Sequence, residues 1–206
     1  MIRRLSIPIS LALLFLLPGC SSTPSEPQTS APSHSWMQQQ QWLEGQQHWQ
    51  INGKIGIRQG QELTAAAMSW TQQSDRYHIF MSGPMGQGAI DIKGSHQNVT
   101  MQISGEGIYF ASSPEELLEQ RLGWSLPIGN LLYWIKGLPA PGTAHQKSLD
   151  QHNRLETLEQ NNWQIRYHSY RTVEDGNLPG KIVLRQGKKI RVTLIIKEWN
   201  LNPPAG

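Results

Sequence analysis

Cys20 is the only cysteine among the 206 residues, and its thiol offers the clearest chemistry in the sequence. Arg3 and Arg4 precede an apolar stretch over residues 7–17, and Gly19 stands directly before the cysteine. That stretch is shorter than the roughly 20 apolar residues that span a bilayer, and it fits the core of a cleavable signal peptide. A lone cysteine in an exported chain has no internal disulfide partner, so we expect Cys20 to be acylated. The alternative is a secretory signal with an incidental cysteine.

These features divide the chain into a signal peptide at 1–19, a lipidated cysteine with a flexible tether at 20–35, and a single folded domain at 36–206. Residues 21–35 are rich in Ser, Pro, Thr and Gln and bury too little apolar surface to offset the entropy of ordering. Ser21 follows the cysteine at the position where lipoproteins retained in the inner membrane typically carry aspartate. Among bacterial lipoproteins as a class, this predicts a lipid anchor on the periplasmic face of the outer membrane.

The charge balance excludes one class of partner. Without the signal peptide, 16 basic residues face 15 acidic ones, a formal charge of +1. A nucleic-acid-binding domain would show clustered lysine and arginine over a larger surface, so we expect no nucleic-acid partner. The short cluster formed by Lys188, Lys189 and Arg191 is interpreted as the solvated end of a strand.

Catalytic motifs are missing from the sequence. The seven histidines are scattered, and no two of them stand four residues apart. There is no G-x-S-x-G, no H-E-x-x-H, no C-x-x-C and no glycine-rich phosphate motif. We therefore expect no catalysis, no metal and no cofactor. A periplasmic lipoprotein enzyme stays open as an alternative, which a cleft holding a strongly perturbed acid–base pair would support.

The elements that must hold any site are mostly strands. Apolar residues alternate with polar ones from Trp49 to Arg58, the period of a half-buried strand. Similar short runs recur between glycine-containing turns, which indicates a meandering antiparallel sheet. The later strands are predicted at 64–72, 77–81, 90–92, 99–103, 108–110, 155–160, 163–170, 181–186 and 189–199.

Three helices accompany the predicted sheet. Residues 36–48 form one amphipathic helix or, because of their glutamine run, a disordered segment. Ser113 and Pro114 begin a second helix that stops near Gly123, and a third spans about 128–136. The fold class is therefore mainly β with helices. A long antiparallel sheet curls, so we expect an incomplete, half-open barrel of nine to eleven strands, lidded by helices and enclosing a hydrophobic cavity.

Eight tryptophans are many for a chain of this size. Several lie on apolar strand faces or helix stripes beside other large apolar residues. They are either ordinary core residues or the walls of an incompletely filled lipid cavity, and the sequence alone does not separate the two. The residues assigned to the cavity are Met68, Trp70, Leu131, Trp134, Trp163 and Ile165.

Met85 is a different kind of apolar residue, because it stands between Pro84 and Gly86 in a turn. Loops run over the surface, so we expect its side chain to be exposed. Exposure forfeits about 1.5–3 kcal/mol relative to burial. Pro84, Met85 and Gly86 are therefore assigned to a loop that inserts into a membrane or a lipid-laden partner; the alternative is a side chain folded back onto the sheet.

Several segments together resemble one family. Leu17-Pro18-Gly19-Cys20 resembles the lipobox of lipoprotein precursors, and 131–139, Leu-Leu-Tyr-Trp-Ile-Lys-Gly-Leu-Pro, is the most specific of the later motifs. With the order and spacing of the remaining segments, the chain from the lipobox to about Trp199 resembles the LolB family of outer-membrane lipoprotein receptors. Those remaining segments are Ala67–Trp70, Gly83–Gly86, Asn162-Trp163 and Ile190–Trp199.

The resemblance implies a receptor that binds acyl chains in a hydrophobic cavity and performs no catalysis. It implies acylated lipoproteins as cargo, a LolA-type periplasmic carrier as donor, the outer membrane as destination, and a monomer. The family carries an exposed apolar residue, usually leucine, in a protruding loop after a proline, and Met85 occupies that position here. Trp70, Trp134 and Trp163 fall where the family places cavity-facing aromatic residues. A structural lipoprotein with a filled core and no lipid ligand is the rival.

Overall fold

The computed structural model describes residues 35–95, 98–174 and 176–204, and these residues form one eleven-stranded antiparallel sheet. The strand order is β6-β5-β4-β3-β2-β1-β11-β10-β9-β8-β7, so the chain meanders outward from the centre on both sides. β6 and β7 are unpaired edges, which leaves the sheet open rather than closed into a barrel. The predicted fold class, mainly β with an open antiparallel sheet of nine to eleven strands and helices, is confirmed, whereas the enclosed cavity stays a prediction. The signal peptide, Cys20 and most of the tether lie outside the described residues and stay predictions.

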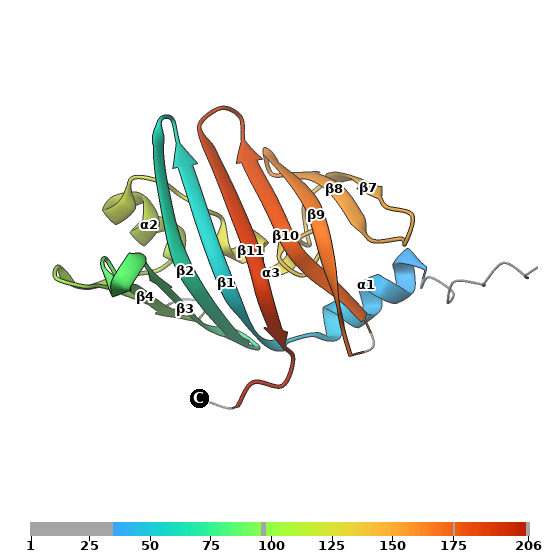
Figure 1. Ribbon diagram of the computed structural model, residues 1–206, viewed down its shortest axis with the longest axis horizontal. Coiled ribbons are helices and arrows are strands. Elements are labelled where there is room, and N and C mark those ends of the chain that lie inside the picture. Colours follow the sequence, from blue (N-terminus) through green and yellow to red (C-terminus); the bar gives the residue numbers. More distant parts are fainter. Residues whose placement is uncertain (1–34, 96–97, 175, 205–206) are drawn as a thin grey trace, which may run out of the picture. The chain divides into compact units, whose positions relative to one another are not determined.

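The strands match the predicted alternation closely, with three helices and one 3₁₀ turn placed between them (Figure 1). The helices are α1 Trp36–Gly45, α2 Pro114–Leu122 and α3 Ile128–Trp134, and η1 Pro84–Gly86 is the 3₁₀ turn. The strands are β1 His48–Gln59, β2 Glu62–Gln73, β3 Arg76–Ser82, β4 Ile90–Gly94, β5 Val99–Ile103, β6 Gly107–Ala111, β7 His145–Leu149, β8 Leu155–Gln160, β9 Trp163–Val173, β10 Gly176–Gln186 and β11 Ile190–Asn200.

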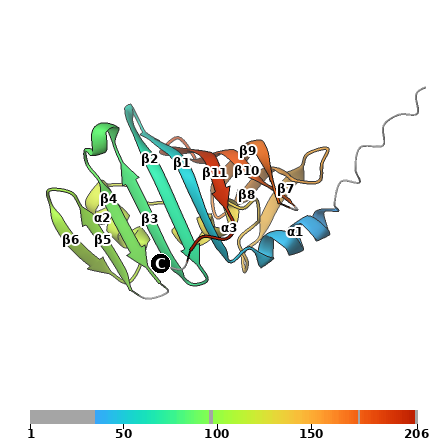
Figure 2. The same ribbon diagram turned by 60° about the horizontal axis from the view of Figure 1, so that its bottom comes forward.

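Helices α2 and α3 cover one face of the sheet, which we call the inner face; in Figure 1 α3 lies behind the central strands and α2 lies to the left of β2, against β5 and β6. Turned by 60°, the β4–β6 part of the sheet comes forward with α2 behind it (Figure 2). The inward residues of the strands and the apolar residues of the helices join in one continuous hydrophobic cluster. The opposite, outer face carries the polar residues of each alternating pair.

Local capping fixes where the helices begin. The Ser35 and Gln38 side chains each accept from the other residue's backbone N–H, which makes a full capping box at the start of α1. This excludes disorder for the glutamine run. The helix ends at Gly45, three residues earlier than predicted, because His48 already pairs with Gln73 in β1 and β2.

Helices α2 and α3 begin where the sequence indicates. Ser113 Oγ accepts from the Glu116 N–H at the start of α2. Gly123 ends that helix with φ of +70°, a left-handed conformation that glycine adopts without penalty. Helix α3 is shorter than expected and closes in a tight turn at Gly137, where φ is +86°.

Two sheet elements differ from the prediction. β7 was not predicted, because His145–Leu149 shows little apolar alternation and its pairing is supplied entirely by β8. β10 begins at Gly176, five residues earlier than expected, and runs through Pro179. The ladder shifts register just after this proline, which lacks an N–H to donate.

Candidate functional site

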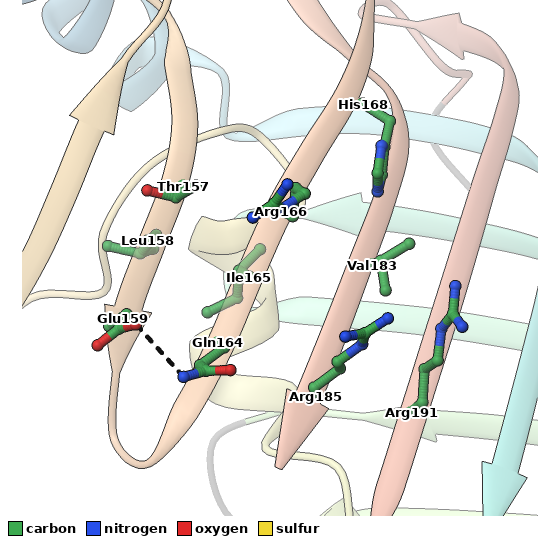
Figure 3. A pocket seen from close by; sticks show the side chains of 10 residues that line it. All are labelled: Thr157, Leu158, Glu159, Gln164, Ile165, Arg166, His168, Val183, Arg185 and Arg191. Atoms are coloured by element: carbon green, nitrogen blue, oxygen red, sulfur yellow. Dashed lines mark hydrogen bonds between the residues drawn. The ribbon is translucent and has the colours of Figure 1, made fainter. Parts of the chain in front are cut away.

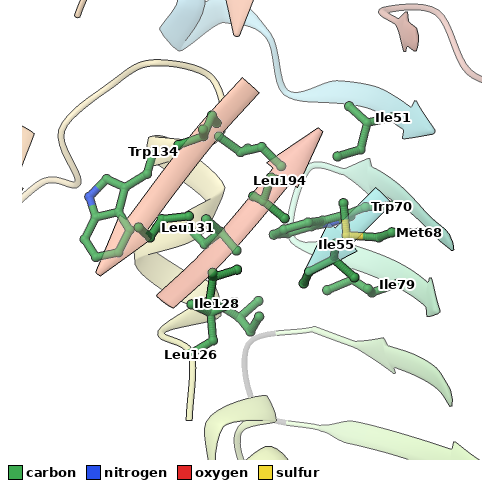
Figure 4. Packing of buried hydrophobic residues seen from close by; sticks show 14 of the residues in the cluster. Ile51, Ile55, Met68, Trp70, Ile79, Leu126, Ile128, Leu131, Trp134 and Leu194 are labelled. Atoms are coloured by element: carbon green, nitrogen blue, oxygen red, sulfur yellow. The ribbon is translucent and has the colours of Figure 1, made fainter. Parts of the chain in front are cut away.

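The six residues assigned to a lipid cavity all lie on the inner face, in one hydrophobic cluster. Each is almost completely buried, from 5 % exposed at Met68 to 0 % at Trp134. Figure 4 shows Leu131, Ile128 and Trp134 packed in the same cluster as Met68 and Trp70. In this conformation side chains of α3 therefore cover the inner face of the sheet. Acyl chains could bind there only by displacing them.

The cavity residues form two groups, and the first sits on β2. The Trp70 ring lies 5.3 Å from that of Trp49 in the neighbouring strand. Its indole Nε1 donates to Oε1 of the buried Gln72, at 3.2 Å. Met68 stands directly opposite Met81 of β3.

Methionine is concentrated in this part of the inner face. Met68, Met81 and Met101 are all buried there, on β2, β3 and β5. Methionine is unbranched and polarizable, so it can repack around an irregular guest. Tyr77 of β3 adds a buried hydroxyl that has no hydrogen-bond partner among the described residues. We call β2–β5 with these residues the methionine-rich half.

The second group surrounds α3 and is held by buried hydrogen bonds. The rings of Trp134 and Trp163 are 6.3 Å apart. Trp134 Nε1 donates to Gln160 Oε1 at 2.8 Å, and the same oxygen accepts from the Ala140 N–H at 2.8 Å. Gln160 Nε2 in turn donates to Ala140 O at 2.7 Å and to Thr143 Oγ1 at 2.8 Å. Gln160 is thus hydrogen-bonded both to α3, through Trp134, and to the segment that follows α3, through Ala140 and Thr143.

Two tyrosines of β9 complete this arrangement. The Tyr167 hydroxyl donates to Trp134 O at 2.9 Å, and the Tyr170 hydroxyl donates to Leu155 O at 2.6 Å. Burial raises the pKa of Tyr167 well above its usual value, so the hydroxyl keeps its proton and stays a donor. We call the region of α3, β8 and β9 the hydrogen-bonded half.

Lys136 extends this half to the amino-terminal helix. Its ammonium donates to Leu43 O at 3.2 Å and to Gln46 O at 3.1 Å, which satisfies carbonyls at the end of α1. Burial lowers the pKa of Lys136 to about 8, and Glu44 opposes that shift. The sequence alone indicates no role for Lys136 or Gln160. The signal that could have found them is a polar residue at an inward position of an apolar segment.

Met85 lies away from the cluster, on η1 between β3 and β4, and its side chain is 94 % exposed. The exposure agrees with the prediction, and the alternative of a side chain folded back onto the sheet does not hold. Met85 has φ of 58°, a left-handed conformation that is costly for a residue with a side chain. Backbone bonds from the Gly83 N–H to Gln87 O and from the Gly86 N–H to Gly83 O hold the turn closed. The turn therefore presents a fixed apolar tip.

The described residues contain neither a helix that could span a membrane nor a cluster of metal-ligating side chains. No helix there is long and apolar enough to cross a membrane. Within residues 35–95, 98–174 and 176–204, no three histidine, cysteine or acidic side chains gather closely enough to hold a metal ion.

An open antiparallel sheet with helices on one face is a fold that other solved structures share. A LolA superfamily protein from Nitrosomonas europaea shares the fold with a TM-score of 0.56 at 12 % identity, over 81 % of this chain and 94 % of that one. The model of the family described as outer membrane lipoprotein LolB matches residues 47–199. The chain belongs to the LolB family, which confirms the resemblance and the outer-membrane localisation expected from the sequence.

Relatives match over nearly the whole chain. The outer-membrane lipoprotein LolB of Pseudomonas paraeruginosa is 38 % identical over 95 % of this chain and 96 % of its own. That of Stutzerimonas stutzeri is 39 % identical, over 91 % of both chains. The similarity therefore includes both halves of the inner face and the turn that carries Met85.

Proposed function

We propose that this outer-membrane lipoprotein accepts acylated lipoproteins from a LolA-type periplasmic carrier and inserts them into the outer membrane, acting as a monomer and without catalysis. Membership of the LolB family and the fold shared with the LolA superfamily support a role in lipoprotein localisation. The observation that carries the proposal is Met85, a large apolar side chain held almost fully in water on a closed turn.

Acyl chains would enter on the inner face, beginning in the methionine-rich half. Each methylene removed from water contributes about 0.8 kcal/mol, so an apolar surface is enough to bind them. Met68 and Met81 face each other there and can change rotamers as a guest enters. Trp70 then forms a rigid wall on the same strand as Met68.

A transfer of this kind needs no nucleotide if each site binds the chains more tightly than the one before. The carrier would bind them least tightly, this inner face more tightly and the bilayer most tightly. Cys20, acylated as predicted, would hold the receptor at the membrane. Mass spectrometry of the mature protein should show two or three acyl chains on that cysteine.

The test is Met85→Glu, assayed as transfer of a fluorescent acylated lipoprotein from the carrier to vesicles. We expect binding to the receptor to persist and insertion to fall at least tenfold, because a carboxylate resists entry into apolar lipid. The free energy of unfolding should change by less than about 0.5 kcal/mol at so exposed a position. Met37→Glu on α1 is the matched control, since Met37 is 77 % exposed. Normal insertion by Met85→Glu would remove the assigned role of the turn.

The second candidate is a structural lipoprotein with a filled core, and the tight packing of Trp134 and Leu131 favours it. Displacement of a fluorescent fatty acid separates the two functions. A receptor whose Cys20→Ala variant, made soluble, still binds an acylated peptide fits the transfer function. Absence of any saturable fatty-acid binding would favour the structural role.

A further inference from the structure

Basic residues are concentrated on the outer face of the central sheet. The strands β1, β9, β10 and β11 contain eight lysine and arginine residues but one acidic residue, Glu198. The whole chain, by contrast, has 18 basic and 15 acidic residues. Six of the cations alternate with buried apolar neighbours and so point outward: Lys54, Arg58, Arg166, Lys181, Arg185 and Arg191.

Three of these cations form a row across adjacent strands, which we call the arginine row. Arg191 of β11 stands opposite Arg58 of β1 on one side and Arg185 of β10 on the other. Like charges directly opposite each other in a sheet are destabilising. Over the described part of the chain, no carboxylate lies within ion-pair distance of these guanidinium groups. Binding of an external anion would offset the repulsion between these three guanidinium groups.

A hollow of about 470 Å³ adjoins the row on the outer face of β8–β11 (Figure 3). Arg166, Arg185 and Arg191 line it, together with His168. The carboxylate of Glu159 at its rim accepts a hydrogen bond from Gln164 at 3.4 Å. Burial lowers the pKa of His168, and Lys181 and the surrounding arginines lower it further. The potential in the hollow is therefore positive.

The arginine row lies at the same end of the sheet as Met85. The β1–β2 turn follows Arg58, the β10–β11 turn separates Arg185 from Arg191, and in an antiparallel meander the β3–β4 connection leaves at that same end. In Figure 2 η1 and the β1–β2 turn both lie toward the top of the view, whereas in Figure 1 η1 lies well below that turn. The turn that bears Met85 therefore leaves at the same end of the strands as the arginine row, but level with Lys54 rather than with Arg58.

We propose that the arginine row and the adjoining hollow bind the phosphate groups of anionic phospholipids at the membrane surface. Arginine presents paired donors that match phosphate oxygens. The outer-membrane location of the family keeps phospholipid headgroups near this domain, which raises their effective concentration. Exposed Ile195 and Leu63 on the same face are compatible with contact at a headgroup layer. The proposal adds to the role of Met85, since headgroup binding would aim the turn at the bilayer.

The test uses the mature chain, residues 20–206, with Cys20→Ser so that no lipid anchors it. All described core residues lie within 35–204, outside this change. We compare binding to phosphatidylcholine vesicles with and without phosphatidylglycerol. The variant Arg58→Gln/Arg185→Gln/Arg191→Gln should lose affinity for the anionic vesicles on the order of 100-fold, because each basic side chain near such a surface contributes about fivefold.

The matched control removes three cations elsewhere, Arg76→Gln/Lys93→Gln/Lys147→Gln, and should bind within a few-fold of the parent. The triple arginine variant should also show a thermal midpoint higher by about 2–4 °C at low salt, because a like-charge row is gone. This readout verifies that the variant folds. Equal losses in both triple variants would overturn the proposal in favour of net charge alone.

Two further arms identify the anion. Inorganic phosphate at constant ionic strength should compete with the anionic vesicles only weakly, since a single phosphate engages few of the cations. Binding of polyglutamate as tight as that of vesicles would overturn the lipid assignment and indicate an acidic protein partner. The Met85→Glu variant should keep its vesicle affinity within a few-fold, so a failure of the insertion role and a failure of this proposal are distinguishable.

Discussion

The two halves of the inner face are built from different interactions although both are apolar and buried. In the hydrogen-bonded half, Gln160, Tyr167 and Lys136 hold specific partners through hydrogen bonds of 2.7–3.2 Å. In the methionine-rich half, the contacts around Met68 and Met81 are nondirectional. The first half can hold α1 and α3 in place while the second changes shape around a guest. One core can therefore combine a rigid frame with an adaptable surface.

The largest expected effect separates the halves by stability. Gln160→Ala leaves the Trp134 Nε1–H and the Ala140 N–H unpaired in the core, so we expect a loss of about 3–5 kcal/mol in the free energy of unfolding. Gln72→Ala, the corresponding change in the methionine-rich half, unpairs the Trp70 indole and should cost about 1–2 kcal/mol. Denaturant unfolding measures both. Equal costs would contradict the distinction between a fixed and an adaptable half.

A smaller effect appears as a dependence of stability on pH. The pKa of Lys136 is about 8 in the folded chain and 10.5 in the unfolded chain. Below pH 8 both states hold the proton, and the folded state bears the full cost of burying the charge. Above pH 8 the folded chain releases the proton first, so the free energy of unfolding should rise by about 2 kcal/mol up to about pH 10.

Replacement of Lys136 isolates that contribution. Lys136→Met should flatten the rise between pH 8 and 10, whereas Lys147→Met, at an exposed lysine of β7, should retain it. Thermal or urea unfolding over this interval provides the measurement. A variant profile parallel to that of the parent would show that Lys136 does not carry the pH dependence.

The smallest expected effect on stability comes from a substitution that tests whether the methionine-rich half changes shape around a bound acyl chain. Met68→Leu nearly conserves volume and should change the free energy of unfolding by less than about 1.5 kcal/mol. It removes a flexible side chain from the methionine-rich half, so we expect acyl-chain binding to weaken severalfold. Ile165→Leu makes a similarly small change in the hydrogen-bonded half and should leave binding unaltered. Titration with a fluorescent fatty acid compares them.

Local sequence signals predicted most of the fold. Alternation located β1 through β6, and Ser113 and Gly123 marked both ends of α2. β7 was not predicted, because an exposed edge strand can form without alternating apolar residues. The start of β10 was not predicted, because Pro179 interrupts the alternation of apolar and polar residues. Pairing with β9 nevertheless keeps this segment in the sheet.

The candidate site was predictable in composition but not in its connections. Apolar neighbours placed Trp70 and Trp134 on a buried face, and the family resemblance assigned them to the cavity. The bond from Trp134 to Gln160 joins residues 26 positions apart, and that from Lys136 to Leu43 joins residues 93 apart. Such partners are set by strand order, which alternation and capping do not encode.

The pairing of β1 with β11 also governs how the chain can fold. Ile55 and Leu194 are partners in the middle of the sheet although roughly 140 residues separate them along the chain. Each flanking meander can assemble from neighbouring hairpins, yet the two can join only once the last strand has been made. Closing the centre of the sheet is therefore a late, long-range step, and we expect it to limit the rate of folding.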